Sequence, residues 1–179
     1  LIGQNPFEVY TQLFTETLGN SYGIGQVLFK ATPLIFTGLS AAFAFRSGLF
    51  NIGAEGQLVI GAFLTAITGF LFSSLPSIIL LPLCLLAGIL GGAVWGMIPG
   101  FMKAKFGAHE VINTIMMNFI AMALVSYMVN NHFAVTATVH TPLIAPAAEL
   151  PRLDSFSDLF RGSPVNLSLF IALLLCFII

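Results

Sequence analysis

The chain has 179 residues, of which 58% are hydrophobic and only 7% are charged, and its mean hydropathy is +1.00. Soluble domains carry roughly 25% charged residues, so this composition indicates a membrane protein. The net charge is −1 and the six basic residues are scattered, which excludes a surface that grips nucleic acid phosphates. We therefore expect the partner of most of the surface to be the lipid bilayer.

Five apolar runs follow one another along the sequence. A transmembrane helix needs roughly 20 apolar residues, and the runs meet that length in whole or in part. They cover residues 27–45, 58–72, 78–98, 111–129 and 165–179. We expect an all-α fold, a polytopic transmembrane helical bundle with about five spans. The first residue is not Met and the last run has no closing flank, so we also expect a fragment of a longer chain.

A polar, glycine-rich stretch, FRSGLFNIGAEGQLVIGAF, occupies residues 45–63 between the first two runs. The second run alone has about 15 residues, roughly 22 Å of helix, which is too short to cross a bilayer. Two interpretations remain open. In the first, the stretch is a solvated cytoplasmic loop. In the second, it enters the membrane as a broken or re-entrant segment that leads into a half-helix, where glycines permit irregular backbone and the Glu55 carboxylate is functional.

Basic residues set the expected orientation. Lys103 and Lys105 lie in the short connection between the third and fourth runs, so the positive-inside rule places this connection in the cytoplasm. Arg46 ends the first run on the same side. By alternation, the first 26 residues and the long polar connection at residues 130–164 lie outside.

Two patterns of small and polar residues stand out in the later runs. Gly88, Gly92, Gly96 and Gly100 repeat every four residues, a spacing that predicts a flat helix-packing stripe. In the fourth run, Glu110, Asn113 and Thr114 share one helical face, and Asn118 follows about one turn further on. Such a polar face forms hydrogen bonds between helices or lines a substrate path.

Sequence motifs of enzymes and metal sites are absent. His109 and Glu110 begin a zinc-protease pattern, but position 113 is Asn and not His, so we propose no metal ligands. The sequence also lacks a phosphate-binding P-loop, a GxSxG elbow and a dinucleotide fingerprint. We therefore expect neither an enzyme nor a resident cofactor, and ATP hydrolysis has no motif in this chain.

Three segments together resemble a known family: FRSGLFNIGAEGQLVIGAF, WGMIPGFMKAKFGAHEVINTIMMNFIA and the apolar run between them. They look like the permease subunits of bacterial ABC importers in the ribose/branched-chain amino acid permease superfamily. Within it, the resemblance is greatest to the nucleoside and simple-sugar branch that works with basic membrane lipoproteins. The likeness runs nearly collinearly from about residue 31 to residue 127.

The resemblance implies one transmembrane permease domain over residues 1–179, in a multi-pass protein of the bacterial plasma membrane about twice this long. Its implied partners are a sister permease subunit, a cytoplasmic ABC ATPase subunit and an extracytoplasmic substrate-binding lipoprotein. By position, Phe50, Asn51, Gly53, Glu55, Gly56 and Gln57 match the first family motif, and Glu110, Asn113, Thr114 and Asn118 match the second.

The function implied is alternating-access import of an uncharged nucleoside or sugar, driven by ATP hydrolysis on a separate protein. The expected substrate-binding residues are Phe50, Asn51, Glu55, Gln57, Asn113 and Asn118. We expect Phe50 to stack on a base and the amide side chains to bond hydroxyls or base edges. Two alternatives remain open, namely a secondary transporter of a small polar solute and a membrane scaffold that transports nothing.

Overall fold

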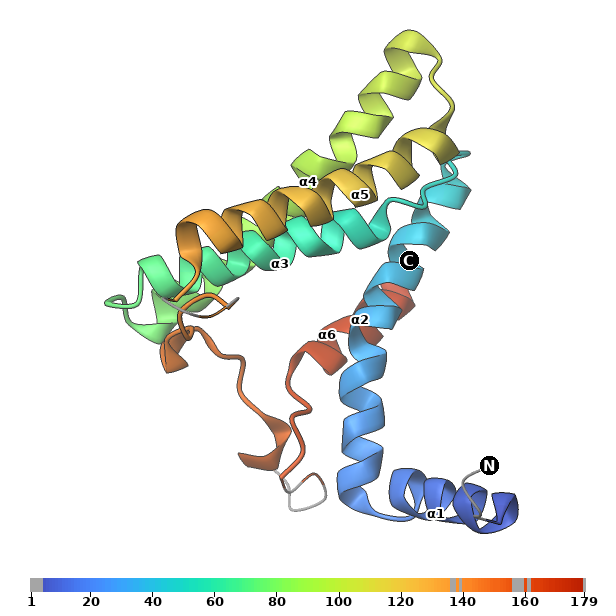
Figure 1. Ribbon diagram of the computed structural model, residues 1–179, viewed down its shortest axis with the longest axis vertical. Coiled ribbons are helices and arrows are strands. Elements are labelled where there is room, and N and C mark those ends of the chain that lie inside the picture. Colours follow the sequence, from blue (N-terminus) through green and yellow to red (C-terminus); the bar gives the residue numbers. More distant parts are fainter. Residues whose placement is uncertain (1–4, 136–137, 139, 156–159, 161, 179) are drawn as a thin grey trace. The chain divides into compact units, whose positions relative to one another are not determined.

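The computed structural model describes residues 5–135, 138, 140–155, 160 and 162–178. Its α-helices are α1 (Pro6–Leu18), α2 (Ser21–Arg46), α3 (Ala54–Leu71), α4 (Ser77–Phe106), α5 (Glu110–Met128) and α6 (Ser168–Ile178), drawn in Figure 1. A π-helical turn follows α5 at Val129–Phe133, and two 3₁₀ turns lie at Pro146–Ala148 and Leu153–Ser155. The described residues form no β-strand, only one isolated bridge between Arg152 and Asn166, so the all-α prediction is confirmed.

Four helical stretches are long and apolar enough to cross a membrane: Ser21–Arg46, Ala54–Leu71, Ser77–Phe106 and Glu110–Phe133. They confirm the predicted multi-pass helical membrane protein. The fifth predicted run is represented by α6, whose 11 described residues give only about 16 Å of helix. The second run becomes long enough as expected, because the first turn of α3 is built from Ala54, Glu55 and Gly56 of the polar stretch.

The chain divides into two compact units, which we describe separately. The first comprises Leu1–Leu39 and Leu150–Ile179, and the second comprises Ser40–Glu149. That the whole chain acts as a single permease domain stays a prediction.

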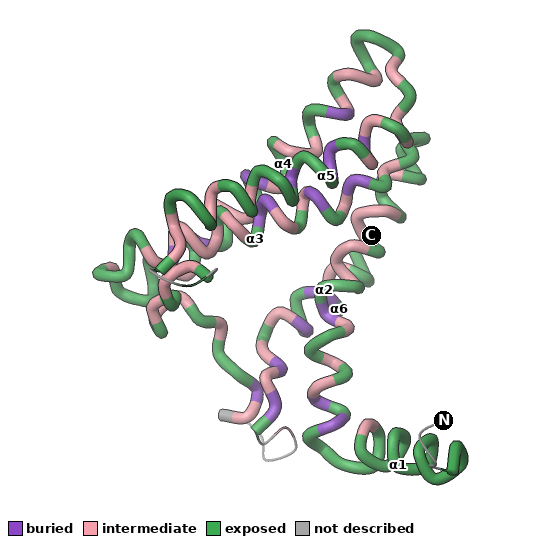
Figure 2. Tube along the Cα trace, viewed as in Figure 1, coloured by how far each residue is buried: buried purple, intermediate pink, exposed green. Residues whose placement is uncertain are grey.

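In the second unit, α3 packs along α4 and also contacts α5. Figure 2 shows buried positions where these helices face one another and exposed positions on their outer sides. The outer side chains are large and apolar, as on Ile78 and Ile89, which are 88% and 65% exposed. Lipid is the solvent for such faces, since apolar side chains gain nothing from facing water.

The predicted glycine stripe explains how closely α3 and α4 approach. A Cβ on Gly92 would lie 3.3 Å from the Gln57 carbonyl oxygen, and one on Gly96 would lie 2.7 Å from Nε2 of Gln57. Gly88 faces the Thr65 hydroxyl, whereas Gly100 has no described neighbour within 4 Å. Three of the four stripe positions therefore face α3.

The first unit contains α1, the first part of α2 and the segment that leads into α6. A small core of Leu153, Val165 and Leu169 packs against Leu28 and Ile35 of α2. The helix α1 was not predicted, although its start signals are present. The Asn5 side chain accepts a hydrogen bond from the Phe7 N–H, Pro6 occupies the first turn, and Glu8 lies near the positive end of the helix dipole.

Candidate functional site

The candidate site begins at the break between α2 and α3. The α2 helix ends at Arg46, and residues 47–53 are not helical before α3 begins at Ala54. Gly48 has a φ of 73°, in the left-handed region that favours glycine, and this residue turns the chain out of α2. The unwound part is therefore shorter than the polar stretch as a whole, because Glu55 and Gln57 already belong to α3.

The side chain of Asn118 on α5 holds both ends of this turn into α3. Its Nδ2 donates to the Ile52 carbonyl at 2.9 Å, and its Oδ1 accepts from the Gly56 N–H at 2.9 Å. The first N–H groups of a helix lack partners within the helix and are normally satisfied by a side chain at the N-cap. Gly53, the N-cap of α3, has no side chain, so Asn118 supplies this acceptor from another helix.

Thr114 completes the attachment one turn earlier on α5. Its hydroxyl accepts a hydrogen bond from the Ile52 N–H at 3.3 Å and donates to the Glu110 carbonyl at 2.8 Å. Thr114 is 3% exposed and Asn118 is 7% exposed. The non-helical backbone at Ile52 thus has both its N–H and its C=O satisfied by α5, and we call Thr114 and Asn118 the α5 clamp.

Two glycines permit this close approach. A Cβ on Gly56 would lie 2.8 Å from Oδ1 of Asn118 and 3.1 Å from its Cα, and one on Gly53 would lie 3.2 Å from Cβ of Thr114. All three distances are so short that the neighbouring atoms would have to shift. The glycines that looked like loop residues in the sequence are therefore packing residues at the α3–α5 contact.

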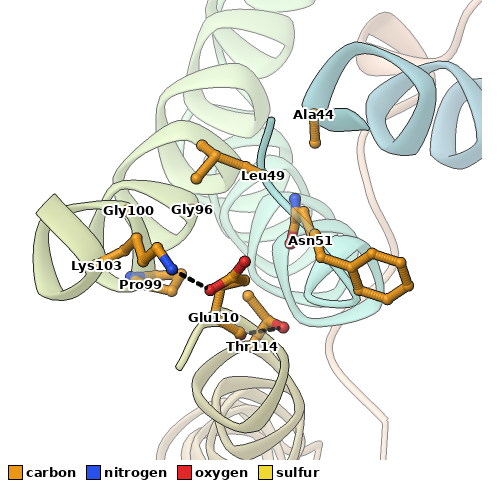
Figure 3. Close-up of a pocket in the computed structure, with 10 residues that line it drawn as sticks. Ala44, Leu49, Asn51, Gly96, Pro99, Gly100, Lys103, Glu110 and Thr114 are labelled. Atoms are coloured by element: carbon orange, nitrogen blue, oxygen red, sulfur yellow. Dashed lines mark hydrogen bonds and ion pairs between the residues drawn. The ribbon is translucent and has the colours of Figure 1, made fainter. Parts of the chain in front are cut away.

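A pocket opens beside the break, with a cavity volume of about 90 Å³. Its lining comes from the end of α2, the break, α4 and α5: Ala44, Leu49, Phe50, Asn51, Gly96, Pro99, Gly100, Lys103, Glu110 and Thr114 (Figure 3). Pockets for drug-sized ligands measure about 300–1,000 Å³. The pocket in this structure is thus smaller than such a ligand requires.

An ion pair occupies one side of the pocket. Nζ of Lys103 on α4 lies 2.6 Å from Oε2 of Glu110 on α5, and the side chains are 39% and 21% exposed (Figure 3). Gly107 brings the two residues together, because it ends α4 in the left-handed conformation with a φ of 64° and reverses the chain. Sequence reasoning used Lys103 only to set orientation and missed this pair. The sequence did contain a signal for the ion pair, namely opposite charges on either side of the glycine that ends α4.

The structure brings some of the predicted binding residues together and separates others. Phe50 and Asn51 line the pocket, and the Phe50 ring packs on Phe45 with centroids 4.9 Å apart. The Asn51 Oδ1 also accepts a hydrogen bond from the Gly53 N–H at 2.8 Å. Gln57 lies over Gly96, which is itself part of the pocket lining.

Like Gln57, the other three predicted residues lie outside the lining. Asn118 is buried in the α5 clamp, with both ends of its amide bonded to backbone. Asn113 is half-buried, and its amide nitrogen lies 3.3 Å from Sδ of Met102. Glu55 is exposed in the first turn of α3, where the positive end of the helix dipole favours its carboxylate.

Four apolar helical stretches of membrane-spanning length, two of them joined by a polar non-helical segment, define a multi-pass membrane protein. Comparison with known families makes this specific. The family described as "Branched-chain amino acid transport system / permease component" matches residues 23–179, and the chain belongs to it.

Individual relatives are similar over most of the chain. The guanosine ABC transporter permease protein NupP of Bacillus subtilis is 39% identical over 174 residues, 95% of this chain and 49% of that protein. The nucleoside ABC transporter permease protein NupB of Lactococcus lactis subsp. cremoris is 36% identical over 96% of this chain and 48% of its own length. The glucose ABC transporter permease protein TsgB13 of Haloferax volcanii is 37% identical over 86% of this chain and 38% of its own.

The chain therefore spans about half the length of the relatives it matches, or less. No solved structure matches it significantly. The resemblance of the sequence to ABC importer permeases of the nucleoside and simple-sugar branch is confirmed by the family and by these relatives.

Proposed function

We propose that this chain forms part of a permease subunit of an ATP-driven importer for nucleosides or simple sugars in a bacterial plasma membrane. The relatives named for guanosine, nucleosides and glucose support these two substrate classes. In this proposal the chain is not an enzyme. A cytoplasmic ABC ATPase hydrolyses ATP, a sister permease completes the pore, and an extracytoplasmic lipoprotein delivers the solute.

The polar break between α2 and α3 is the observation that supports this function most strongly. Non-helical backbone at membrane depth is tolerated only where it is buried in protein or lines a water-filled cavity. The α5 clamp satisfies the N–H and the C=O of Ile52, and Asn51 lines the adjacent pocket. Non-helical breaks next to spanning helices form solute sites in many transporters.

Within this proposal, the predicted residues have different roles. Phe50 and Asn51 contact the solute, because both line the pocket and both are accessible from it. Gln57 also contacts the solute, because its side chain lies over Gly96 in the pocket lining. Asn113 and Glu55 contribute polar groups when the pocket enlarges. Asn118 acts as a positioning residue that fixes the break, since its amide is already bonded to backbone.

The pocket must enlarge for this function, since about 90 Å³ is too small for a nucleoside. Alternating access supplies such a change, because one part of a permease rocks against another around the solute site. The Lys103–Glu110 ion pair joins α4 to α5 across the pocket, so opening between these helices separates its two charges.

Uptake by cells that express the full-length gene with its neighbouring genes tests the function. We expect accumulation of radiolabelled guanosine, ribose or glucose that disappears when the ATPase subunit is inactivated. Uptake that survives loss of the ATPase and follows a proton or sodium gradient would contradict the proposal and identify a secondary transporter. Accumulation of neither nucleosides nor sugars, with the protein present in the membrane, would favour a scaffold instead.

A further inference from the structure

The helix α1 carries an apolar face that the described protein does not cover. Its apolar residues recur at three- and four-residue intervals, which places them on one side of a helix. Phe7, Tyr10, Phe14 and Leu18 belong to this face and are 81%, 63%, 60% and 55% exposed. The opposite side carries Glu8, Gln12 and Glu16. None of the residues of α1 is buried.

A fixed elbow joins α1 to α2. The Asn20 side chain donates to the Glu16 carbonyl at 3.1 Å, and its Oδ1 accepts from the Gly23 N–H at 2.6 Å, so one residue closes α1 and opens α2. Gly23 is buried, and a Cβ there would collide with the carbonyl oxygens of Glu16 and Thr17. The direction of α1 relative to the start of α2 is therefore set by packing and not by a flexible linker.

The direction of α1 is informative because α2 is a candidate membrane span. Within the first unit, Figure 1 shows α1 running across the axis of α2 instead of continuing along it. A helix that crosses the axis of a spanning helix at its end runs along the membrane plane. Arg46, at the other end of α2, marks the cytoplasmic side by the positive-inside rule, so α1 belongs to the outer surface.

The composition of α1 fits this position. Aromatic side chains are enriched at the membrane–water interface, and amphipathic helices rest there with the apolar face towards the acyl chains. Lys30, in the third turn of α2, is exposed and long enough to extend its ammonium back to the same headgroup level. Glu8 and Glu16 are the charged residues of α1, so its binding needs no anionic lipid.

We propose that α1 is an interfacial helix whose aromatic face is immersed in the outer-leaflet headgroup region. Its occupant is a zwitterionic lipid surface. Together with the fixed elbow at Asn20, this contact sets the depth at which α2 enters the bilayer. The proposal requires only that α2 spans the membrane and is independent of the transported solute.

Site-directed spin labelling of the full-length protein tests this proposal in phosphatidylcholine vesicles. Cys84 and Cys176 are replaced by Ala, as is any further cysteine of the full chain, and single cysteines are introduced for labelling. Phe7→Cys, Tyr10→Cys and Phe14→Cys probe the apolar face. Glu8→Cys, Gln12→Cys and Glu16→Cys are the matched controls on the opposite face. Collisions with molecular oxygen, which concentrates in lipid, and with a water-soluble nickel chelate are measured at each position.

We expect labels on the apolar face to collide more with oxygen than with the chelate, and the control face to show the reverse. The two accessibilities should alternate with a period of 3.6 residues along α1. Equal chelate access on both faces would overturn the proposal, because α1 would then lie in water. Apolar-face labels shielded from both reagents would also overturn it, since a protein surface would cover α1. Using three positions per face keeps the result decisive if one variant fails to fold.

Discussion

Asn118→Ala is expected to destabilise the folded protein by about 1–3 kcal/mol, because it removes the side-chain partner of a buried and of a part-buried backbone group. The Gly56 N–H and the Ile52 carbonyl both bond to this side chain. An unsatisfied buried group costs about 1–3 kcal/mol. The thermal midpoint of the purified full-length protein, and its amount in the membrane, measure the effect.

Asn113→Ala is the matched control for this substitution. Asn113 lies on the same helix, but its amide contacts only the Met102 sulfur, a weak acceptor. We expect its thermal midpoint to stay close to that of the unmodified protein. If Asn118→Ala proved as stable as Asn113→Ala, the α5 clamp would not hold the break in place.

Gly61→Leu is expected to prevent normal packing of α3 against α4. A Cβ at this position would lie 2.9 Å from the Gly88 carbonyl oxygen, which is backbone and cannot rotate away. The two helices must then separate, which also strains the nearby hydrogen bond from the Thr65 hydroxyl to the Cys84 carbonyl at 3.2 Å. Overpacking of this kind costs about 1–3 kcal/mol, and we expect the upper end of that range.

Gly100→Leu is the control for this packing prediction. Gly100 belongs to the α4 glycine stripe that Gly61 meets at Gly88, but no described atom lies within 4 Å of a Cβ placed at Gly100. Both variants are compared by thermal midpoint and by yield of folded protein in detergent. An equal loss of thermal stability in the two variants would contradict the prediction. It would show that added bulk destabilises these helices whether or not it lies at the α3–α4 contact.

The positions of the helices were largely predictable because hydropathy and breakers mark them. The predicted run at residues 111–129 matches α5 to within a residue at each end. The predicted run at residues 78–98 ends eight residues before α4 does, because the helix continues through Pro99 and Gly100 and ends only at its C-cap, Gly107. The helix α1 was missed because its apolar residues are too few for a span, and only spans were sought.

The residue types of the site could be predicted, but not their roles. A polar residue at position 118 in an apolar helix had to bond something, yet its partners lie 62 and 66 residues away in sequence. Neither the periodicity of α5 nor the motif around Gly56 reveals that pairing. For this reason Asn118 was predicted to bind the solute. Its contacts show instead that its side chain caps the N-terminus of α3.

The Lys103–Glu110 pair illustrates the same limit at shorter range. Seven residues separate the two charges, and a continuous helix would place them on one face two turns apart. Because Gly107 reverses the chain between them, they meet instead across two helices at 2.6 Å. Local sequence shows the glycine and the charges but not the angle at which α5 returns to α4.

Solute protection of a thiol at position 51 tests the central claim, that the break between α2 and α3 lines the transport path. Asn51→Cys is introduced into the complete transporter in vesicles, on a background without Cys84, Cys176 or any further cysteine, and is exposed to a thiol reagent supplied on both sides of the membrane. Leu71→Cys, at the exposed far end of α3, is the control. We predict that the solute taken up by the transporter slows modification after Asn51→Cys and leaves Leu71→Cys unaffected. A thiol at position 51 that reacts at the same rate with and without the solute, in vesicles that transport it, would contradict the account.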